Sequence, residues 1–302
     1  MRLLLVRHGE TVDNVAGVYA GVTDSALTCH GYLQAERLGA HLSKKGFRIV
    51  EIFCSDLKRA YLTAEAIRQF QDPQPLPPTK LELIREQNFG SFEGKKSIRQ
   101  DPNVVGREDI VSEVESKKSL ESRANAFIND HLLKLFYQTA DEHTVAVISH
   151  GIFLKYLWKS LLCRFPSACV SLVQKSGAPR APSIKNLGLW FNTAYMELDI
   201  KQRPISLAAT PQNSVPCEFT SNNPHNHETS SGKQSSIPVT IDSKLVQGPT
   251  GLKLNLYILE INFCEHLRGL KKSRGGTSNL PYNPAQKNIF KFFNQRKSAG
   301  LG

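Results

Sequence analysis

Short apolar runs, separated by longer amphipathic stretches, mark the first half of the chain. The runs Arg2 to Val6, Ile49 to Ser55 and Thr144 to Ser149 each contain consecutive aliphatic residues. Runs of this length and composition are typical of strands that are buried on both faces of a parallel sheet. The pattern therefore predicts three buried strands.

The stretches between these runs have helical spacing. Leu33, Leu38 and Leu42 are spaced for one face of a helix. Thr28 precedes them and is a residue type that caps helices, so we predict a helix over Gly31–Leu42. Two further helices are predicted at Asp56–Phe70 and Leu120–Tyr137. Alternation of strands and helices predicts an α/β fold with a parallel, doubly wound sheet.

Loops separate some of these elements. The four prolines of Asp72–Pro78 predict a loop, and Leu81–Ile84 follows it as a short strand or extended stretch. Residues 95–119 are polar and charged, which predicts an excursion on the surface.

The second half of the chain is less regular. Leu187–Leu198 and Leu254–Phe263 have strand-like composition, whereas residues 202–248 are rich in Ser, Asn, Thr, Pro, His and Gln. Such a composition lacks the apolar periodicity that orders a chain, which predicts a disordered insertion within a domain over residues 1–268. Residues 269–302 then form a basic, flexible tail.

The charge balance narrows the class of partner. The chain has 38 Lys plus Arg against 27 Asp plus Glu, a formal charge of +11, which favours anionic partners. No apolar stretch is long enough for a membrane span or a signal peptide, so we expect an intracellular protein, cytoplasmic or nuclear. The six cysteines form no CxxC pair, and no ligand cluster for a metal stands out.

The segment after the first apolar run carries the clearest chemistry. Arg7 and His8 come directly after a predicted buried strand, at the end of a sheet where α/β proteins place their active sites. A neutral imidazole can attack phosphorus while a guanidinium holds the phosphoryl oxygens. Taken alone, the Arg-His-Gly tripeptide is better explained as a surface turn.

Three further segments change that interpretation. They are Ser55-Asp56-Leu57-Lys58-Arg59-Ala60, Leu83-Ile84-Arg85-Glu86 and Ser149-His150-Gly151. With Arg7-His8-Gly9-Glu10-Thr11 they occur in the order and at the separations of the histidine phosphatase, or phosphoglycerate mutase-like, superfamily, which the chain resembles over about residues 1–200 and again at 254–267. The resemblance implies a three-layer α/β/α sandwich with a mostly parallel sheet.

The resemblance also implies a mechanism. His8 would be the nucleophile that becomes phosphorylated, with Arg7, Arg59 and His150 around the phosphoryl oxygens. Glu86 would protonate the leaving group and then activate water. Neither a metal nor an organic cofactor is expected.

Two positions have open interpretations. Asn14 and Thr23 fall where the family contacts phosphate or substrate, but either could equally be a turn or capping residue. For Arg85 we favour an ion pair with a carboxylate over a contact with substrate.

The sequence departs from the family pattern in two places. Ala26 stands where the family has a turn proline, within Asp24-Ser25-Ala26-Leu27-Thr28. The Gly-Glu-Ser segment of the family's cap, expected before the helix at Leu120, is represented only by Lys117–Ser122. Because that cap helps to select substrate, the resemblance leaves the substrate open.

The segment between Glu86 and Leu120 is short, which favours a phosphatase over a mutase. A mutase must shield its phosphorylated intermediate from water, and this segment offers only a modest cover. Glu265-His266-Leu267 resembles the fructose-2,6-bisphosphatase-like branch, so a sugar phosphate such as fructose 2,6-bisphosphate is one expected substrate. A phosphoglycerate mutase is the alternative.

The tail contains a second motif. Gln286, Ile289, Phe292 and Phe293 have the spacing of peptides that dock on the replication sliding clamp, and in a 3₁₀ turn the first three would share a face. Residues 286–293 thus predict a clamp-binding peptide, with an amphipathic tail that folds back on the domain as the alternative. A docking protein that has kept an enzyme fold is therefore a second class of function.

Overall fold

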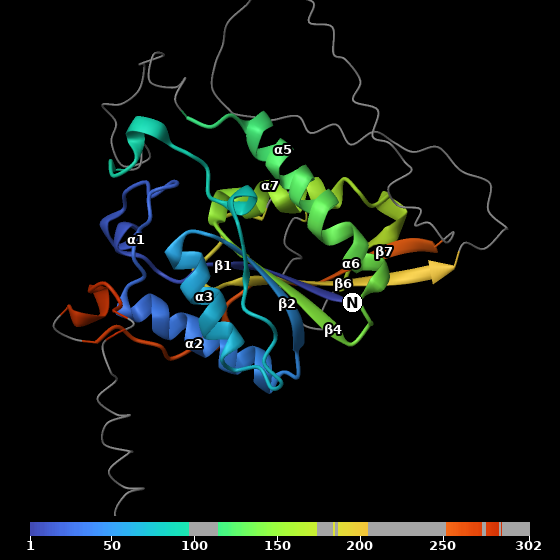
Figure 1. The fold of residues 1–302 in the computed structure, drawn as a ribbon, viewed down its shortest axis with the longest axis horizontal. Coiled ribbons are helices and arrows are strands. Elements are labelled where there is room, and N and C mark those ends of the chain that lie inside the picture. The colour runs from blue at the N-terminus through green and yellow to red at the C-terminus, as the bar shows by residue number, and fades with distance from the viewer. Residues whose placement is uncertain are drawn as a thin grey trace, which may run out of the picture.

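The computed structural model of the chain describes residues 1–96, 114–173, 184, 187–204, 252–273, 276–283 and 285. Within these residues seven strands form one sheet in the order β3-β2-β4-β1-β6-β7-β5 (Figure 1). The strands are β1 (Arg2–Arg7), β2 (Arg48–Ser55), β3 (Thr79–Leu81), β4 (His143–Ser149), β5 (Val170–Leu172), β6 (Tyr195–Pro204) and β7 (Leu252–Phe263). Strand β6 runs antiparallel to its neighbours β1 and β7, and the other neighbouring pairs are parallel. The prediction of a mostly parallel sheet is confirmed.

Helices cover both faces of this sheet. In Figure 1 helices α2 (Cys29–Lys44) and α3 (Lys58–Arg68) lie on one side, and α5 (Lys117–Phe127), α6 (Leu133–Gln138) and α7 (Gly151–Leu162) lie on the other. A short helix, α1 (Val12–Ala16), follows β1. The fold is thus the three-layer α/β/α sandwich that the sequence predicted.

The apolar side chains of β1 pack into two hydrophobic clusters, one on each face of the sheet. Leu3 and Leu5 belong to the cluster on the side of α5 and α7, whereas Leu4 and Val6 belong to the cluster on the side of α2 and α3. Successive side chains of a strand point to opposite faces, so a central strand between two helical layers must be apolar at every position. This requirement explains the unbroken run at the start of the sequence.

Several element boundaries differ from the sequence prediction. A π-helical turn at Ile128–Leu132 divides the helix that was predicted as continuous. The extended stretch at Leu81–Ile84 is the end of β3 followed by a 3₁₀ turn over Glu82–Ile84. The strand predicted from Leu187 begins only at Tyr195, because the preceding residues form a loop. Helix α7 was not predicted.

The first part of the tail packs on the domain. The ring of Tyr282 stacks on Tyr32 with centroids 3.7 Å apart, and its backbone N–H donates to the carbonyl of Leu27 at 2.8 Å. Lys272 lies 2.9 Å from the carboxylate of Glu10. Contacts with the domain therefore continue past the predicted boundary at residue 269.

Other predicted segments lie mostly beyond what the structure describes. Residues 202–204 end β6, and the remainder of the predicted insertion, up to residue 248, is outside the described residues. The predicted clamp-binding motif at 286–293 is outside them as well. Among the helices that the structure describes, none has the length and apolar character needed to cross a membrane.

Candidate active site

Side chains from three of the sequence motifs meet at the carboxyl ends of β1 and β4. The two strands pair in parallel with Arg7 opposite Ser149, so His8 and His150 leave the sheet side by side. Their imidazole rings lie with centroids 5.0 Å apart, and both side chains are buried. Arg59 reaches the same point from the first turn of α3.

The hydrogen bond of His8 fixes its tautomer. Its Nδ1 lies 2.7 Å from the carbonyl oxygen of Gly9. A carbonyl only accepts, so Nδ1 must carry the hydrogen and Nε2 the lone pair. Burial and the nearby guanidinium groups of Arg59 and Arg7 hold the pKa of His8 well below its usual range. His8 is therefore a neutral imidazole whose Nε2 can act as a nucleophile.

Arg59 fixes the opposite tautomer at His150. Its Nε donates to Nδ1 of His150 at 3.2 Å, so His150 carries its hydrogen on Nε2. Burial, followed by the charge of Arg59, keeps the pKa of His150 well below the usual value. Its Nε2 is buried and has no hydrogen-bond partner among the described residues. A neutral ring with an unused N–H donor therefore faces the nucleophile.

Arg59 itself is fully buried. Its Nη1 and Nη2 donate to the carbonyl oxygens of Thr23 and Gly21 at 2.7 and 2.6 Å. These bonds and the one to His150 occupy three of the five N–H donors of the guanidinium, leaving two for an anion. Arg59 thus orients His150 and holds the loop at residues 21–23.

Arg7 is held by a loop that comes much later in the chain. Its Nη1 donates to the carbonyl oxygen of Trp190 at 2.6 Å. Its Nε is buried without a hydrogen-bond partner in the described part of the chain. An added Cβ at Gly151 would lie 3.6 Å from this Nε, so Arg7 passes over the first residue of α7. The guanidinium therefore has unused N–H donors beside His150, which occupies the N-cap position of α7.

Glu86 lies at the N-terminus of α7. Its carboxylate accepts the backbone N–H of Phe153 at 2.9 Å and that of Ile152 at 3.2 Å. It also accepts the N–H of Gln87 at 3.0 Å. The free N–H groups and the dipole at a helix start stabilise a negative group there. Burial lowers the pKa of Arg7 and of Arg59, and the charge of Glu86 opposes this lowering. Its bonds to the start of α7, next to His150, place Glu86 at the same site.

A partly buried ion pair supports the backbone around Glu86. Arg123 donates to the carbonyl oxygens of Leu83 and Arg85 at 2.6 and 3.0 Å, and to that of Glu86 at 3.3 Å. The same guanidinium pairs with Glu115 through two 2.8 Å bonds. This pair and a hydrogen bond from the Ser119 hydroxyl lower the pKa of Glu115, against the opposing effect of burial. The backbone around Glu86 is therefore fixed by α5.

The Glu115–Arg123 ion pair bears on the cap segment. The counterpart of the family's Gly-Glu-Ser segment was predicted at Lys117–Ser122. In the structure Ser116 caps helix α5 by accepting the N–H of Ser119, and Glu115 makes the ion pair. Glu115 and Ser116 thus form a Glu-Ser pair immediately before the helix, just N-terminal to the predicted segment. A serine followed by a helical segment was the available signal.

The loop after His8 is anchored at each residue. The N–H of Gly9 donates to the hydroxyl of Thr63 at 3.0 Å, and that of Glu10 to the amide oxygen of Gln34 at 3.0 Å. A Cβ on Gly31 would lie 2.0 Å from the carbonyl oxygen of Glu10. Helix α2 can approach the loop this closely only because Gly31 has no side chain.

Asn14 and Thr23 are both engaged in local structure. Asn14 completes a capping box with Thr11, and its Oδ1 also accepts Nδ2 of Asn192 at 3.1 Å. The hydroxyl and the N–H of Thr23 both donate to the carboxylate of Glu93. Only the amide NH₂ of Asn14 is left for a substrate, and at Thr23 the hydrogen bonds favour the structural role.

Arg85 pairs with Asp56 through both carboxylate oxygens. The pairing holds the pKa of Asp56 below its usual range. This geometry agrees with the structural role that the sequence analysis favoured for Arg85.

We expect the free energy of unfolding to fall at acid pH, because several histidines are buried in the neutral form. His8, His150 and the buried His266 all have a lowered pKa, that of His266 falling to about 4, so the folded protein keeps them neutral. In the unfolded chain a histidine titrates near 6.5. Below that pH the unfolded chain binds more protons, so the free energy of unfolding should fall by about 1.4 kcal/mol per pH unit for each histidine. Above it this contribution stays constant.

Urea titrations at pH values of about 7.5, 6.5 and 5.5 would measure this loss. His266→Gln is the matched control, since removing this group should lower the slope by its own contribution, about 1.4 kcal/mol per pH unit at most. An equal free energy of unfolding at the highest and lowest of these pH values would contradict the assignment of neutral buried rings.

Comparisons with known proteins show which family the chain belongs to. The model of the histidine phosphatase superfamily, branch 1, matches residues 3–176, more than half of the chain. A Schizosaccharomyces pombe protein named as a probable phosphatase is 37% identical over 175 residues, which cover 56% of this chain and 60% of that protein. A 2,3-bisphosphoglycerate-dependent phosphoglycerate mutase of Latilactobacillus sakei is 38% identical over 92 residues, which cover 30% of this chain and 39% of that enzyme.

The chain therefore spans less than two thirds of the length of either relative. Among solved structures, one named mycobacterial hydrolase 1 has a TM-score of 0.53 and 22% identity, covering 68% of this chain and 92% of its own. This similarity supports the fold. Since the family match extends over the strands and helices that bring the motif residues together, the chain belongs to branch 1 of the histidine phosphatase superfamily.

Proposed function

We propose that this chain is a phosphatase that hydrolyses phosphomonoesters without a metal ion, through a phosphohistidine at His8. One observation carries the proposal. The imidazole rings of His8 and His150 lie with centroids 5.0 Å apart, and Nε2 of His150 and Nε of Arg7 are buried donors without a partner in the described residues. Buried polar atoms in proteins nearly always have hydrogen-bond partners. A phosphoryl group would provide acceptor oxygens for these donors.

The first half of the reaction is an in-line displacement. Nε2 of His8 would form a bond to phosphorus as the bond to the leaving oxygen breaks. Arg7, Arg59 and His150 would donate to the three equatorial oxygens, where negative charge is concentrated. The carboxylate of Glu86 would take the proton of the bound phosphomonoester monoanion and pass it to the leaving oxygen, which releases the alcohol.

The second half reverses these roles. A water molecule would give a proton to Glu86 and attack phosphorus, breaking the bond to Nε2 of His8. Inorganic phosphate would leave with the proton that water gave to Glu86, and the neutral imidazole of His8 and the carboxylate of Glu86 would be restored. The two arginines supply the positive charge that the transferring group needs.

Hydrolysis is proposed over phosphoryl transfer to a second acceptor. The longer of the two alignments is with the protein named as a probable phosphatase, which supports this choice. A sugar phosphate such as fructose 2,6-bisphosphate is the proposed substrate class, and its support is the resemblance of Glu265-His266-Leu267 to the fructose-2,6-bisphosphatase-like branch. Phosphoglycerate mutase activity is the alternative within the family.

The test is phosphate release by the full chain in the presence of EDTA. We expect turnover of p-nitrophenyl phosphate and of at least one compound in a panel of sugar and glycerate phosphates. Rapid quenching should also trap label from a ³²P-substrate on the protein in an acid-labile, alkali-stable form. Interconversion of phosphoglycerates faster than phosphate release would favour the mutase. Loss of activity in EDTA, or the absence of any labelled intermediate, would contradict the proposed mechanism.

We also propose that residues 286–293 bind the replication sliding clamp. The support is the spacing of Gln286, Ile289, Phe292 and Phe293, together with a basic segment that suits an acidic partner. The full chain should bind the clamp, and Phe292→Ala with Phe293→Ala should remove that binding without changing phosphatase activity. An isolated peptide of residues 275–302 that fails to bind the clamp would contradict this proposal. If it holds, part of the protein is nuclear.

A further inference from the structure

A loop outside the family match holds the backbone of the nucleophile strand. The backbone N–H of Thr193 donates to the carbonyl oxygens of Arg7 and His8 at 3.0 and 3.2 Å. Asn192 Nδ2 donates to the carbonyl of His8 at 3.1 Å, and the carbonyl of Trp190 accepts from Arg7. The loop at residues 189–193 therefore contacts both the guanidinium and the residue that carries the nucleophile.

The backbone of this loop is strained. Thr193 is fully buried and has φ of 55°, in the left-handed region that a β-branched residue rarely adopts. Such a conformation is unfavourable and persists only where surrounding contacts impose it. Residues with such a strained backbone are often found at functional sites.

His266 holds Thr193 in place. The hydroxyl of Thr193 donates to the carbonyl of Asn192 at 2.8 Å, so its oxygen accepts from Nε2 of His266 at 3.1 Å. Burial lowers the pKa of His266 to about 4, and the ring is therefore neutral at neutral pH. Its one hydrogen is on Nε2, and Nδ1 has no hydrogen-bond partner among the residues described. This ring is therefore aimed at Thr193.

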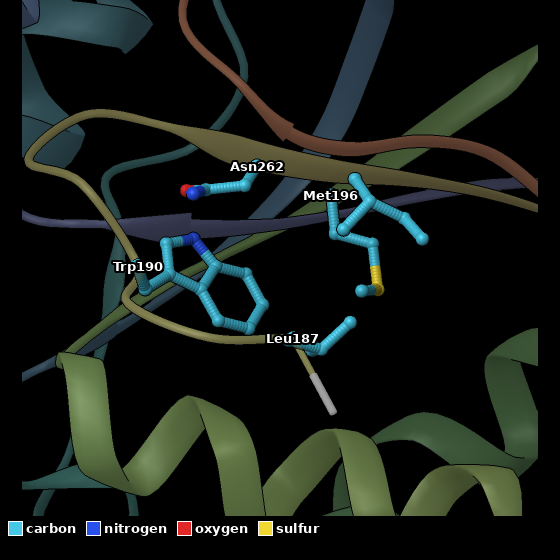
Figure 2. Close-up of a pocket in the computed structure, with 5 residues that line it drawn as sticks. Leu187, Trp190, Met196 and Asn262 are labelled. Carbon is cyan, nitrogen blue, oxygen red and sulfur yellow. The ribbon is translucent and has the colours of Figure 1, made fainter. Parts of the chain in front are cut away.

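Asn262 holds the other end of the loop. Its Oδ1 accepts the N–H of Phe191 at 3.0 Å, and its Nδ2 donates to the carbonyl of Leu189 at 2.8 Å. Asn262 has φ of 53°, which turns its side chain toward the loop at the end of β7. Asn262 and Trp190 line the same small apolar pocket (Figure 2). The two hydrogen bonds of the Asn262 amide therefore hold the residues on either side of Trp190, whose carbonyl accepts from Arg7.

We propose that Asn262 and His266 are positioning residues for phosphoryl transfer. They hold the loop at residues 189–193 so that the carbonyl of Trp190 aims Arg7 and the N–H of Thr193 fixes the backbone of His8. Both residues follow the 205–251 segment and lie outside the match at 3–176, so the C-terminal strand completes a site whose catalytic groups all come from the family region. This inference rests on the function proposed for Arg7 and His8.

The test compares variants that differ only in the bond to Thr193. His266→Gln keeps an N–H donor near the position of Nε2, whereas His266→Asn is too short to reach the hydroxyl. We expect His266→Asn to lower kcat on p-nitrophenyl phosphate by about 10- to 100-fold, since small misplacements of reacting groups have effects of this size. KM should change by less than about threefold, and inhibition by vanadate should weaken with kcat. His266→Gln should stay within about threefold of the unsubstituted chain in kcat.

Asn262→Gly tests the second contact. Glycine keeps the left-handed backbone at no cost but removes both bonds to the loop, so a similar loss of kcat is expected. Gln202→Ala is the matched control. Its amide also bridges two backbone carbonyls, those of Phe136 and Tyr137, but away from this loop. It should leave kcat unchanged.

A second measurement does not depend on turnover. The ¹H–¹⁵N resonances of the His8 ring should move in His266→Asn and stay in place in Gln202→Ala. Unmoved His8 resonances, or normal kcat in folded His266→Asn and Asn262→Gly, would overturn the inference. If the unsubstituted chain releases no phosphate but the His8 resonances move as expected, the proposed function fails while the positioning contact stands.

Discussion

Replacing His8 with alanine is expected to abolish phosphate release, with a loss of kcat on the order of 10⁴-fold or more. The physical reason is that the bond to the Gly9 carbonyl leaves the lone pair of His8 on Nε2, in a ring that lies 5.0 Å from that of His150. His150 cannot take over, because its Nδ1 accepts from Arg59 and its Nε2 carries the hydrogen. The measurement is steady-state hydrolysis of p-nitrophenyl phosphate in EDTA, with the ³²P-labelling experiment run in parallel.

The control for this substitution is His143→Ala. His143 begins β4 at the opposite end of the strand from His150 and is only partly buried, so activity should remain. A His8→Ala variant that is folded by circular dichroism yet labels with phosphate would show that another residue is the nucleophile. Retention of more than about a tenth of the activity would have the same meaning.

The structure brings together the side chains that the sequence proposed for the site. Arg7, Arg59 and His150 stand at fixed places after a strand or in the first turn of a helix, and parallel strands bring such places to one edge of the sheet. Glu86 was proposed from the family resemblance alone, since it follows a 3₁₀ turn rather than a strand. The apolar runs that precede the two histidines predicted their strands because both faces of the sheet are covered.

The contributions that the sequence did not reveal are made by backbone atoms. Trp190 contributes a carbonyl oxygen and Thr193 an N–H, and no residue type marks either role. Thr193 also adopts a left-handed conformation that its β-branched side chain disfavours, so local propensity predicted a continuous strand from Leu187 instead. The strand begins only at Tyr195 because this loop turns toward β1.

The ion pair of Glu115 and Arg123 was missed for a different reason. Both are charged residues in or beside a polar stretch, a composition that usually indicates a solvated surface. Their role depends on three backbone carbonyls around Glu86 that only the folded chain brings within reach. Tertiary contacts of this kind have no periodicity along the sequence.

The acid role of Glu86 predicts an effect that depends on the leaving group. Glu86→Gln removes the proton donor, and general acid catalysis contributes about 10²- to 10⁴-fold to a rate. An alkyl phosphate releases a strongly basic alkoxide that must be protonated as it leaves, so kcat/KM for a sugar phosphate should fall by about this factor. p-Nitrophenolate is stable without a proton, so kcat/KM for p-nitrophenyl phosphate, which reports the first half of the reaction, should fall far less.

This comparison separates the acid role from a structural one. Glu86 also accepts the N–H groups of Ile152 and Phe153, and a glutamine amide cannot accept through its nitrogen. A disturbed helix start would reduce kcat/KM for both substrates by the same factor, because Arg7 and His150 lie at that end of α7. Equal losses would therefore assign Glu86 to the framework of the site. A loss confined largely to the alkyl phosphate would identify Glu86 as the group that delivers the proton, since only that substrate needs it in the step that forms phospho-His8.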